Sequence, residues 1–507
     1  MQKSPVIVNA QQMQQIEARL FAAGMPVAAL MEKVAGLLVQ ETLRLYPHFK
    51  RVGVIVGPGH NGGDGLVMAR ELWLRGCQVL RYSPLEKRKE LTQAHWQYAD
   101  HLGIPQVTEV AALQDCDLIL DGLFGFGLTR AITGELAAVL EEVNQWLMPK
   151  LSIDLPSGIH TDTGAVLGTA FSADQTFCLG LWKLACFQDQ ALPYLGKTQL
   201  VDFGIPEADI TAILGDRSPV QVMTPALARA SLPLPRPPVT HKYKQGHLLL
   251  ICGSQRYAGG AILTGLGARA SGVGMLSIAV PASLKPILVA QLPEALIIAC
   301  PETDTGAIAR LPDEVNLANY SAIACGPGLS FDAQTVVEQA LDTPSPLILD
   351  ADGLNCLAQL HPLAVLSQRE APTVLTPHWG EFKRLFPDIS PDTPLEAAQQ
   401  AAQTSGVTVL LKGAKTAIAA PNAPLWLIGE STPALARGGS GDVLTGLIGG
   451  LLAQPTPKSI SLPQQVAAAA CWHAQAGVAA AQNRSELGVD APTLAQYLIS
   501  TLPPIDL

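Results

Sequence analysis

The sequence has few charged residues, and this scarcity argues against several classes of protein. Charged residues make up only 15% of the 507 residues, and the net charge at pH 7 is -10. An acidic chain is a poor partner for nucleic acids or anionic membranes, because their phosphates repel its carboxylates. With 48% apolar residues, the chain also has little of the composition that leads to disorder. We therefore expect a globular protein that binds small polar molecules.

Paired cysteines and long apolar runs are also missing. The nine cysteines lie singly between Cys77 and Cys471, so neither a disulfide framework nor a zinc site is indicated. The N-terminal segment MQKSPVIVNAQQMQQIEARL has no apolar signal core, and apolar runs elsewhere end before about 18 residues. We expect a cytoplasmic protein without a membrane or nucleic-acid partner.

The length of the chain favours more than one domain, since one domain takes about 150 residues. Residues 219–247 are rich in proline and end in a basic cluster, which interrupts the alternation of strands and helices on either side. We place a boundary near residue 222, which gives domains 1–222 and 223–507.

Short apolar strands alternate with helical segments in both halves. The first half opens with helices at residues 10–22 and 26–46 and continues with the strands RVGVIV, QVLRY, CDLILD, KLSIDL and QTFCLG. The second half contains GHLLLICG, MLSIAV, SAIACG, PLILDA and PTVLTP. This alternation is typical of a parallel sheet covered on both faces. We predict an α/β protein of two three-layer domains, with functional groups at the carboxyl ends of the strands.

The loop GPGHNG at residues 57–62 fits the dinucleotide fingerprint between a strand and a helix. An NAD site needs an acidic residue about 20 residues further on. This chain has Arg81 and Tyr82 there, which leaves only an NADP variant. Asp64 also follows the loop closely, and its carboxylate would repel a pyrophosphate. The run is better suited to a hard cation or to sugar and amide groups.

Two later strand ends carry similar groups. LILDGLFGFGLTR places Asp121 before a glycine-rich turn, whose amides and Arg130 could hold a phosphate. LSIDLPSGIHTDTG places Asp154 and Ser157 at the next strand end. Each aspartate alone could simply cap a turn, but three such loops indicate a site.

In order and spacing, GPGHNGGDG, DGLFGFGLTR and DLPSG resemble the NAD(P)H-hydrate epimerase family over residues 1–215. The resemblance implies that Asn61, Asp121 and Ser157 bind potassium and that Asp154 contacts the hydrate. It implies further substrate contacts from His60, Asn61, Gly62, Gly63, Asp64, Gly125, Phe126, Gly127, Leu128, Thr129 and Arg130. The sequence departs from the family at His60, where asparagine is usual.

A second glycine-rich turn occurs in ARGGSGDVLTGLIGGLLAQ. Gly438, Gly439, Ser440 and Gly441 lead into an apolar helix, so their backbone N–H groups converge on a place suited to anionic oxygens. Asp442 follows in the first turn and can accept a hydroxyl proton during phosphoryl transfer. The alternative is that Asp442 only caps the helix.

This turn resembles the ribokinase-like superfamily. With CGSQRYAGGAIL, CGPGL, LDADGLN, TPHWGEFKRL and LLKGAKT in that order, residues 225–505 resemble the NAD(P)H-hydrate dehydratase branch. The resemblance implies a ribokinase-like domain with a catalytic Asp442. It implies substrate contacts at Gly260 or Ala261, Gly328, His378 and Asp442. It implies nucleotide contacts at Lys412, Gly413, Ala414, Lys415, Thr416, Gly438, Gly439, Ser440 and Gly441.

Together the resemblances imply a repair sequence for hydrated NADH and NADPH, called NADHX and NADPHX. Hydration places a hydroxyl on the ring carbon next to nitrogen, which gives R and S epimers. The Rossmann-like first domain would interconvert them, with Asp154 as our candidate for proton transfer. The second domain would dehydrate the S epimer with ADP or ATP and magnesium. We expect a homo-oligomer.

Three other interpretations fit parts of the sequence. A ribokinase-like small-molecule kinase fused to a dinucleotide-binding domain shares Asp442 but leaves the first site unexplained. An NADP-dependent oxidoreductase relies on the first loop and Arg81 and leaves the second domain unexplained. A non-catalytic first domain rests on His60 alone.

Overall fold

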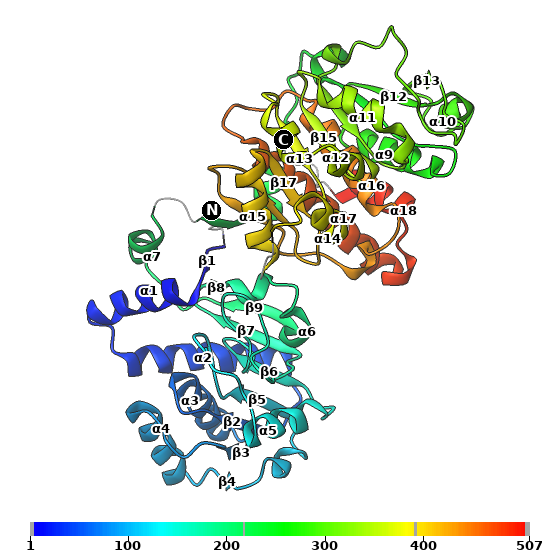
Figure 1. Ribbon diagram of the computed structural model, residues 1–507. Coiled ribbons are helices and arrows are strands. Elements are labelled where there is room, and N and C mark those ends of the chain that lie inside the picture. The colour runs from blue at the N-terminus through cyan, green and yellow to red at the C-terminus, as the bar shows by residue number, and fades with distance from the viewer. Residues whose placement is uncertain (1–4, 216–218, 390–392, 502–507) are drawn as a thin grey trace. The chain divides into compact units, whose positions relative to one another are not determined.

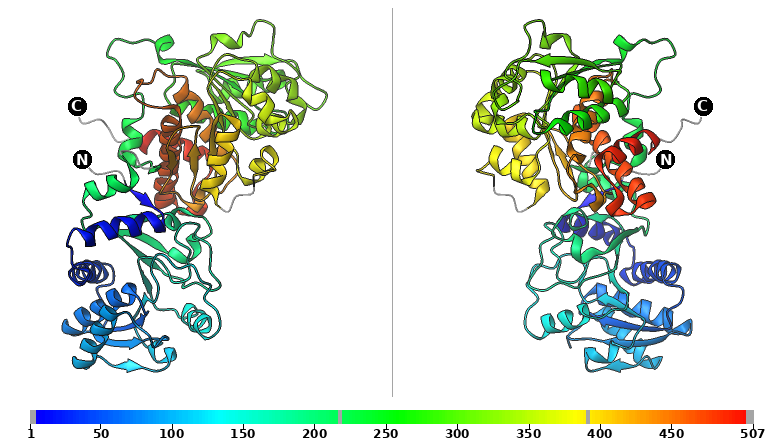
Figure 2. Two further views of the ribbon diagram at one scale, coloured as in Figure 1. Left: turned by 60° about the vertical axis from the view of Figure 1, so that its left-hand side comes forward. Right: turned by 90° about the vertical axis from the view of Figure 1, so that its right-hand side faces the viewer.

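The computed structural model describes residues 5–215, 219–389 and 393–501, and the chain forms two units. The first unit spans Met1–Ser218, and the second spans Pro219–Leu507. Each unit has one large sheet with helices on both faces (Figure 1, Figure 2). This arrangement confirms the predicted class of two three-layer α/β folds, Rossmann-like in the first unit and ribokinase-like in the second.

The first unit is built on seven parallel strands in the order β4-β3-β2-β5-β6-β7-β9. Their bounds are β2 Arg51–Val56, β3 Gln78–Tyr82, β4 Gln106–Val107, β5 Leu118–Gly122, β6 Lys150–Ile153, β7 Gln175–Leu179 and β9 Lys197–Val201. A separate parallel pair joins β1, Ile7–Val8, to β8, Trp182–Lys183.

Alternating side chains bury both faces of this sheet. Val54 and Leu120 point into a core that includes helices α1 to α4, whereas Ile55 and Ile119 point into a second core that includes α5. The helices are α1 Ala10–Ala22, α2 Val27–Leu45, α3 His60–Leu74, α4 Glu90–His101, α5 Glu135–Asn144, α6 Leu192–Leu195 and α7 Glu207–Leu214.

The second unit has a ten-stranded sheet in the order β10-β19-β18-β17-β16-β15-β14-β11-β12-β13. Its strands are β10 Val220–Val222, β11 His247–Ile251, β12 Met275–Pro281, β13 Leu296–Cys300, β14 Ala322–Cys325, β15 Leu347–Leu349, β16 Thr373–Leu375, β17 Thr408–Leu411, β18 Ala417–Ala419 and β19 Leu425–Leu427. The strand β18 is antiparallel to both its neighbours, which corrects the expectation of a wholly parallel sheet. The connections at residues 412–416 and 420–424 are too short for a parallel crossover.

Helices cover both faces of the second sheet as well. Helices α9, α16 and α17 share a core with alternate strand residues such as Leu248 and Leu250. On other strands, α11 packs on β14, and α15 packs on β17 and β18. The bounds are α8 Pro225–Ala230, α9 Ala258–Ala270, α10 Lys285–Gln291, α11 Gln334–Leu341, α12 Asp352–Gln359, α13 Pro362–Ser367, α14 Trp379–Leu385, α15 Pro394–Ser405, α16 Ser440–Leu452, α17 Leu462–Arg484 and α18 Ala491–Thr501.

Helices of the described ranges differ in length and in apolar character. No single helix there is long and apolar enough to cross a membrane. The bent pair of α1 and α2 satisfies length and composition only when both helices are counted together.

The strand β10 lies in the segment where the boundary near residue 222 is expected. Val220–Val222 pair in parallel with Leu425–Leu427, so β10 belongs to the second sheet. The division of the chain therefore falls slightly ahead of the expected boundary.

We predict that a fragment of residues 219–507 is more stable than one of residues 223–507. The shorter fragment loses the ladder to β19 and the buried side chain of Val222, which is worth about 1–3 kcal/mol. Thermal and urea unfolding of the two fragments measure the difference. Equal stabilities would show that β10 contributes nothing to this unit.

Candidate active sites

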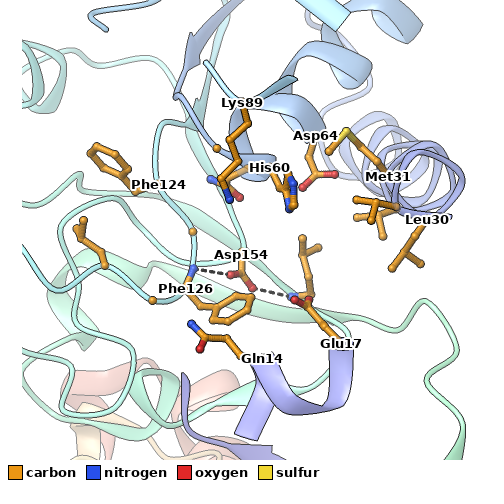
Figure 3. A pocket seen from close by; sticks show the side chains of 18 of the residues that line it. Gln14, Glu17, Leu30, Met31, His60, Asp64, Lys89, Phe124, Phe126 and Asp154 are labelled. Carbon is orange, nitrogen blue, oxygen red and sulfur yellow. Dashed lines mark hydrogen bonds between the residues drawn. The ribbon is translucent and has the colours of Figure 1, made fainter. Parts of the chain in front are cut away.

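Three loops of the first unit meet where β2, β5 and β6 end, because these strands are neighbours in the sheet. They border a cavity of about 440 Å³, shown in Figure 3. Eight of the residues expected at this site line it: His60, Asn61, Asp64, Gly125, Phe126, Gly127, Leu128 and Asp154. Helix α1 contributes Gln14 and Glu17, and β8 contributes Lys183.

Four other residues that were expected to contact the substrate do not line the cavity. A Cβ atom on Gly62 would lie 2.0 Å from the carbonyl oxygen of Gly57, and one on Gly63 would lie 2.6 Å from the Met31 side chain. These two glycines therefore allow close packing of α3. Thr129 and Arg130 are exposed outside the cavity, so the expected phosphate contact of Arg130 is not formed by this arrangement.

Asp154 is held by a buried ion pair. Its φ of 70° is in the left-handed region, which L-residues other than asparagine and aspartate rarely adopt, and such strain is typical of functional sites. One carboxylate oxygen is 2.6 Å from Lys183 Nζ and 3.3 Å from the Leu179 amide, and the other accepts from the Phe126 amide at 2.8 Å. Burial alone would lower the pKa of Lys183, but the Asp154 carboxylate raises it above its usual value.

The carboxylates of Glu17 and Asp64 line the same cavity and have fewer polar contacts than that of Asp154. Neither side chain makes a hydrogen bond to another residue in the described parts of the chain. Burial raises the pKa of Glu17 to about 7, although Lys183 opposes the shift. Burial, followed by the charges of Asp154 and Glu17, raises the pKa of Asp64 well above its usual value. Glu17 can thus exchange protons near neutral pH, and Asp64 keeps its proton to a higher pH than an exposed aspartate does.

Oxygen atoms for a cation can come from Asp121 and Ser157, which lie outside the cavity lining, and from Asn61, which is part of it. The buried Asp121 carboxylate accepts from the Ser157 amide at 2.8 Å, the Ser157 hydroxyl at 2.7 Å, the Ser152 hydroxyl at 3.2 Å and the Leu123 amide at 3.1 Å. Burial raises the pKa of Asp121 to about 6 despite these bonds. The side-chain nitrogen of Asn61 is buried and has no hydrogen-bond partner in the described chain.

The donor set fits a hard monovalent cation in its chemistry, since amide, hydroxyl and carboxylate oxygens are the ligands such ions prefer. The four hydrogen bonds nevertheless fill the acceptor positions of Asp121. A cation there must replace at least one of them, and the rotatable Ser157 hydroxyl is the donor that can turn away. Among the described residues, no three His, Cys, Asp or Glu side chains form a metal-binding group.

Arg81 decides against the oxidoreductase interpretation of the first loop. Its side chain is buried, donates to the carbonyls of Ile104 and Trp96 at 3.1 Å each, and pairs with Asp100. The guanidinium therefore stabilises the fold and does not face a ligand.

The second site forms where β15, β16 and β17 end side by side. Lys412, after β17, places Nζ 2.7 Å from an oxygen of the buried Asp350, which follows β15. Thr445 of α16 donates to the other oxygen of Asp350 at 2.6 Å. A Cβ atom on Gly441 would lie 3.5 Å from Lys412 Nζ, so the glycine-rich turn and the KGAKT segment meet.

Asp442 lies half-buried in the first turn of α16, next to this ion pair. Burial raises the pKa of Asp442 to about 7, with Asp350 adding to the shift and Lys412 opposing it. Its carboxylate caps no helix, because the N-cap is Gly439 with a φ of 90°. The imidazole of His473 contacts the carbonyl of Ser440 at 3.0 Å and fixes the turn from behind.

The remaining expected residues surround this centre. His378 caps α14, since its Nδ1 accepts from the Gly380 amide at 2.9 Å, yet 56% of its side chain is exposed. The backbone of Lys412 bonds to Pro377, so His378 lies beside the nucleotide segment. A Cβ atom on Gly260 would lie 3.4 Å from the Gly328 amide nitrogen, which places these glycines together.

Ala261 and Gly260 were expected as alternatives, and only Gly260 is accessible. Ala261 is fully buried, so it cannot contact a ligand. The segment Lys412–Thr416 connects β17 to β18, with Gly413 and Ala414 exposed. Gly438 is exposed as well, whereas Ser440 is buried.

Comparisons with known proteins agree with the two-site architecture. Residues 248–500 match a family described as NAD(P)H-hydrate dehydratase, and residues 27–185 match the YjeF-related protein N-terminus. A bifunctional NAD(P)H-hydrate repair enzyme of Synechocystis sp. is 60% identical over 97% of this chain and 94% of its own length. The chain belongs to the bifunctional NAD(P)H-hydrate repair enzyme family. The family membership expected from the motifs is therefore confirmed.

A second relative and a solved structure are also similar to this chain. The bifunctional NAD(P)H-hydrate repair enzyme of Thermosynechococcus vestitus is 50% identical over 98% of this chain and 97% of its own length. A crystal structure of the ADP/ATP-dependent NAD(P)H-hydrate dehydratase from Bacillus subtilis, co-crystallised with ATP/Mg2+, is 33% identical. It covers 54% of this chain and 95% of its own, with a TM-score of 0.45.

Three residues of these sites were not predicted from the sequence: Lys183, Asp350 and Glu17. Lys183 had a signal, because it is the single charge in the apolar stretch LGLWKLACF. Asp350 belongs to a quoted family motif, but nothing in the motif shows that it pairs with Lys412. Glu17 had no signal, since a glutamate in an amphipathic helix is usually exposed.

We predict that Lys183→Met destabilises the first unit by about 3–5 kcal/mol, because it leaves the buried Asp154 carboxylate unpaired. The double variant with Asp154→Asn should be less destabilised than the sum of the two single variants. Urea unfolding of the four proteins measures this coupling. Strictly additive losses would show that the ion pair has no energetic role.

Proposed function

We propose that the chain repairs hydrated NADH and NADPH in two steps, with R and S epimers interconverted in the first unit and the S epimer dehydrated in the second. Membership of the repair family over nearly the whole chain supports the overall reaction. The assignment of one reaction to each unit is supported by the geometry, because each sheet carries its own site. A kinase fused to a binding domain leaves the first of these sites without a purpose.

The second site supports dehydration through phosphorylation. The hydrate's hydroxyl oxygen attacks the terminal phosphorus of ADP or ATP while Asp442 accepts its proton, and the phosphate then leaves as a ring proton is lost. A carboxylate that titrates near pH 7 suits a general base. Lys412 and the N–H groups from Gly438 to Gly441 face the nucleotide phosphates.

Neutralisation of phosphate charge is the chemistry that a bound magnesium ion supplies. Asp350 is already occupied by Lys412 and Thr445, so the described site offers few carboxylate oxygens for a metal. Magnesium is therefore expected to arrive with the nucleotide, which is how this ion is commonly held.

We predict that Asp442→Asn lowers the dehydration rate by about 10²–10⁴-fold while leaving nucleotide binding and epimerisation intact. Only the ionised carboxylate accepts a proton, so the wild-type rate should fall as the pH drops below about 7, the pKa of Asp442. The Asn variant should lack this dependence. Rates at saturating nucleotide and S epimer measure the effect. A variant within threefold of wild type would contradict the role of Asp442.

The first site is proposed to bind potassium through Asn61, Asp121 and Ser157 and to hold the hydrate beside Asp154. The rotatable hydroxyl of Ser157 and the oxygen atoms that these three side chains carry support this assignment. The ion would supply a fixed positive charge that orients the substrate. The proposed substrate contacts are the loop residues that line the cavity, which are His60, Asn61, Asp64 and Gly125 to Leu128.

We predict that epimerisation depends on potassium and that Asp121→Asn weakens this dependence at least tenfold, because the variant removes the ligand's charge. The rate is measured over a series of potassium concentrations, with tetramethylammonium keeping the ionic strength constant. Unfolding temperature is recorded beside it, since Asp121 also binds Ser157. An unchanged potassium dependence in a folded variant would refute the ion assignment.

The cellular setting is proposed to be the cytoplasm. All nine cysteines are free, as expected for a reducing compartment. We also propose a homo-oligomer whose partners are small molecules, in keeping with the net charge of -10.

A further inference from the structure

The first cavity contains more carboxylates than its single buried lysine can pair. Glu17, Asp64 and Asp154 all line it, and Lys183 is bound to Asp154 at 2.6 Å. Two backbone amides occupy the same carboxylate. Three of the four acceptor positions of this carboxylate are thus occupied. These surroundings suit a fixed charge that positions the substrate better than the proton transfer expected of Asp154 from the sequence.

Glu17 and Asp64 have the opposite surroundings. Figure 3 shows Glu17 near Asp154 on one side of the pocket and Asp64 near His60 on the other, with both carboxylates directed into it. In the described chain they make no hydrogen bonds that would hold them in one protonation state. Each is buried enough for its pKa to rise, to about 7 in Glu17. Because the charge of Glu17 raises the pKa of Asp64 further, the state in which both carboxyl groups are ionised is disfavoured. A state with one group protonated and the other ionised is then available to the pair.

Epimerisation requires two proton carriers in such opposite states. When the bond between the ring carbon and the hydroxyl oxygen breaks, the nitrogen lone pair forms a C=N⁺ bond and the oxygen needs a proton to leave as water. Inversion then requires a water molecule to add to the opposite face and lose a proton. One acid and one base on opposite sides of the ring meet both needs.

We propose that Glu17 and Asp64 are the catalytic acid and base of epimerisation. This assignment rests on the epimerase activity proposed above. The protonated carboxyl group gives its proton to the departing hydroxyl, and the other carboxylate takes a proton from the water that adds, while the C=N⁺ electrons return to nitrogen. One water is released and one is consumed, and the proton ends on the other carboxylate. The enzyme is then ready for the reverse epimer.

The mechanism assigns different parts to the other two charged groups. Asp154 places its carboxylate next to the cationic ring of the intermediate, and Lys183 keeps that carboxylate in place. Lys183 also lies 5.5 Å from the centre of the Phe126 ring, which fixes this wall of the cavity. Neither group gains or loses a proton.

The test uses the full chain and separated R and S hydrates, without nucleotide, so that only epimerisation is followed. Glu17→Gln and Asp64→Asn should each lower the rate of epimer interconversion by about 10²–10⁴-fold. The exposed Glu109→Gln, outside the cavity, is the matched control and should retain the wild-type rate. Dehydration of pure S hydrate with nucleotide should remain within twofold in all variants, and an unchanged thermal unfolding profile shows that the first unit is folded in each of them.

Oxygen-18 water supplies a second readout. Wild type should incorporate one solvent oxygen for each epimerisation, and its bell-shaped pH profile should lose one limb in Glu17→Gln. Epimerisation within threefold of wild type in either variant would overturn the assignment, as would inversion without oxygen exchange. Failure of the wild-type protein to interconvert the epimers would instead refute the proposed function, and this inference with it.

Discussion

A buried pair of one lysine and one aspartate organises each of the two sites. Lys183 binds Asp154 in the first unit, and Lys412 binds Asp350 in the second, at 2.6 and 2.7 Å. Removing such charges from water is costly, and removing only one partner costs more, so the pair fixes the surrounding loops. Because this lysine is engaged, Glu17 in the first site and Asp442 in the second form no ion pair with it.

Without such an ion pair, a buried carboxylate in each site titrates closer to neutral pH. Burial brings the pKa of Glu17 and of Asp442 to about 7, where each group can accept or donate a proton under physiological conditions. The same physical arrangement thus serves two reactions. In the proposed mechanisms, the carboxylates of the first site act on carbon–oxygen bond cleavage and the carboxylate of the second acts on phosphoryl transfer.

The parallel sheets bring these groups together from distant parts of the chain. His60 and Asp154 follow β2 and β6, and Asp121 lies in β5 between these two strands. Asp350, His378 and Lys412 follow three neighbouring strands of the second sheet. This is why the order of strands in the sheet, and not the distance along the sequence, determines which residues share a site. The antiparallel strand β18 returns the chain shortly after Lys412, so the KGAKT segment, which is the proposed nucleotide contact, forms a tight connection.

Much of this architecture could be predicted from the sequence, because apolar strands, glycine-rich loops and helix starts leave local patterns. The strands β2 and β3 have the bounds expected from RVGVIV and QVLRY, and α1 has those expected at residues 10–22. Short edge strands such as β10 leave too few residues for a pattern. Whether Arg81 faces a ligand or the core, or whether Glu17 faces solvent or a cavity, depends on tertiary packing that no local pattern encodes.

The central claim is that two sites on one chain repair both epimers of the hydrate. It is tested most directly by following R hydrate, S hydrate and reduced nucleotide together, by chromatography, after an epimer mixture and ADP or ATP are added to the full chain. The account predicts that both epimers disappear and that reduced NADH or NADPH is recovered completely. Consumption of the S epimer while the R epimer persists at its uncatalysed rate would contradict it.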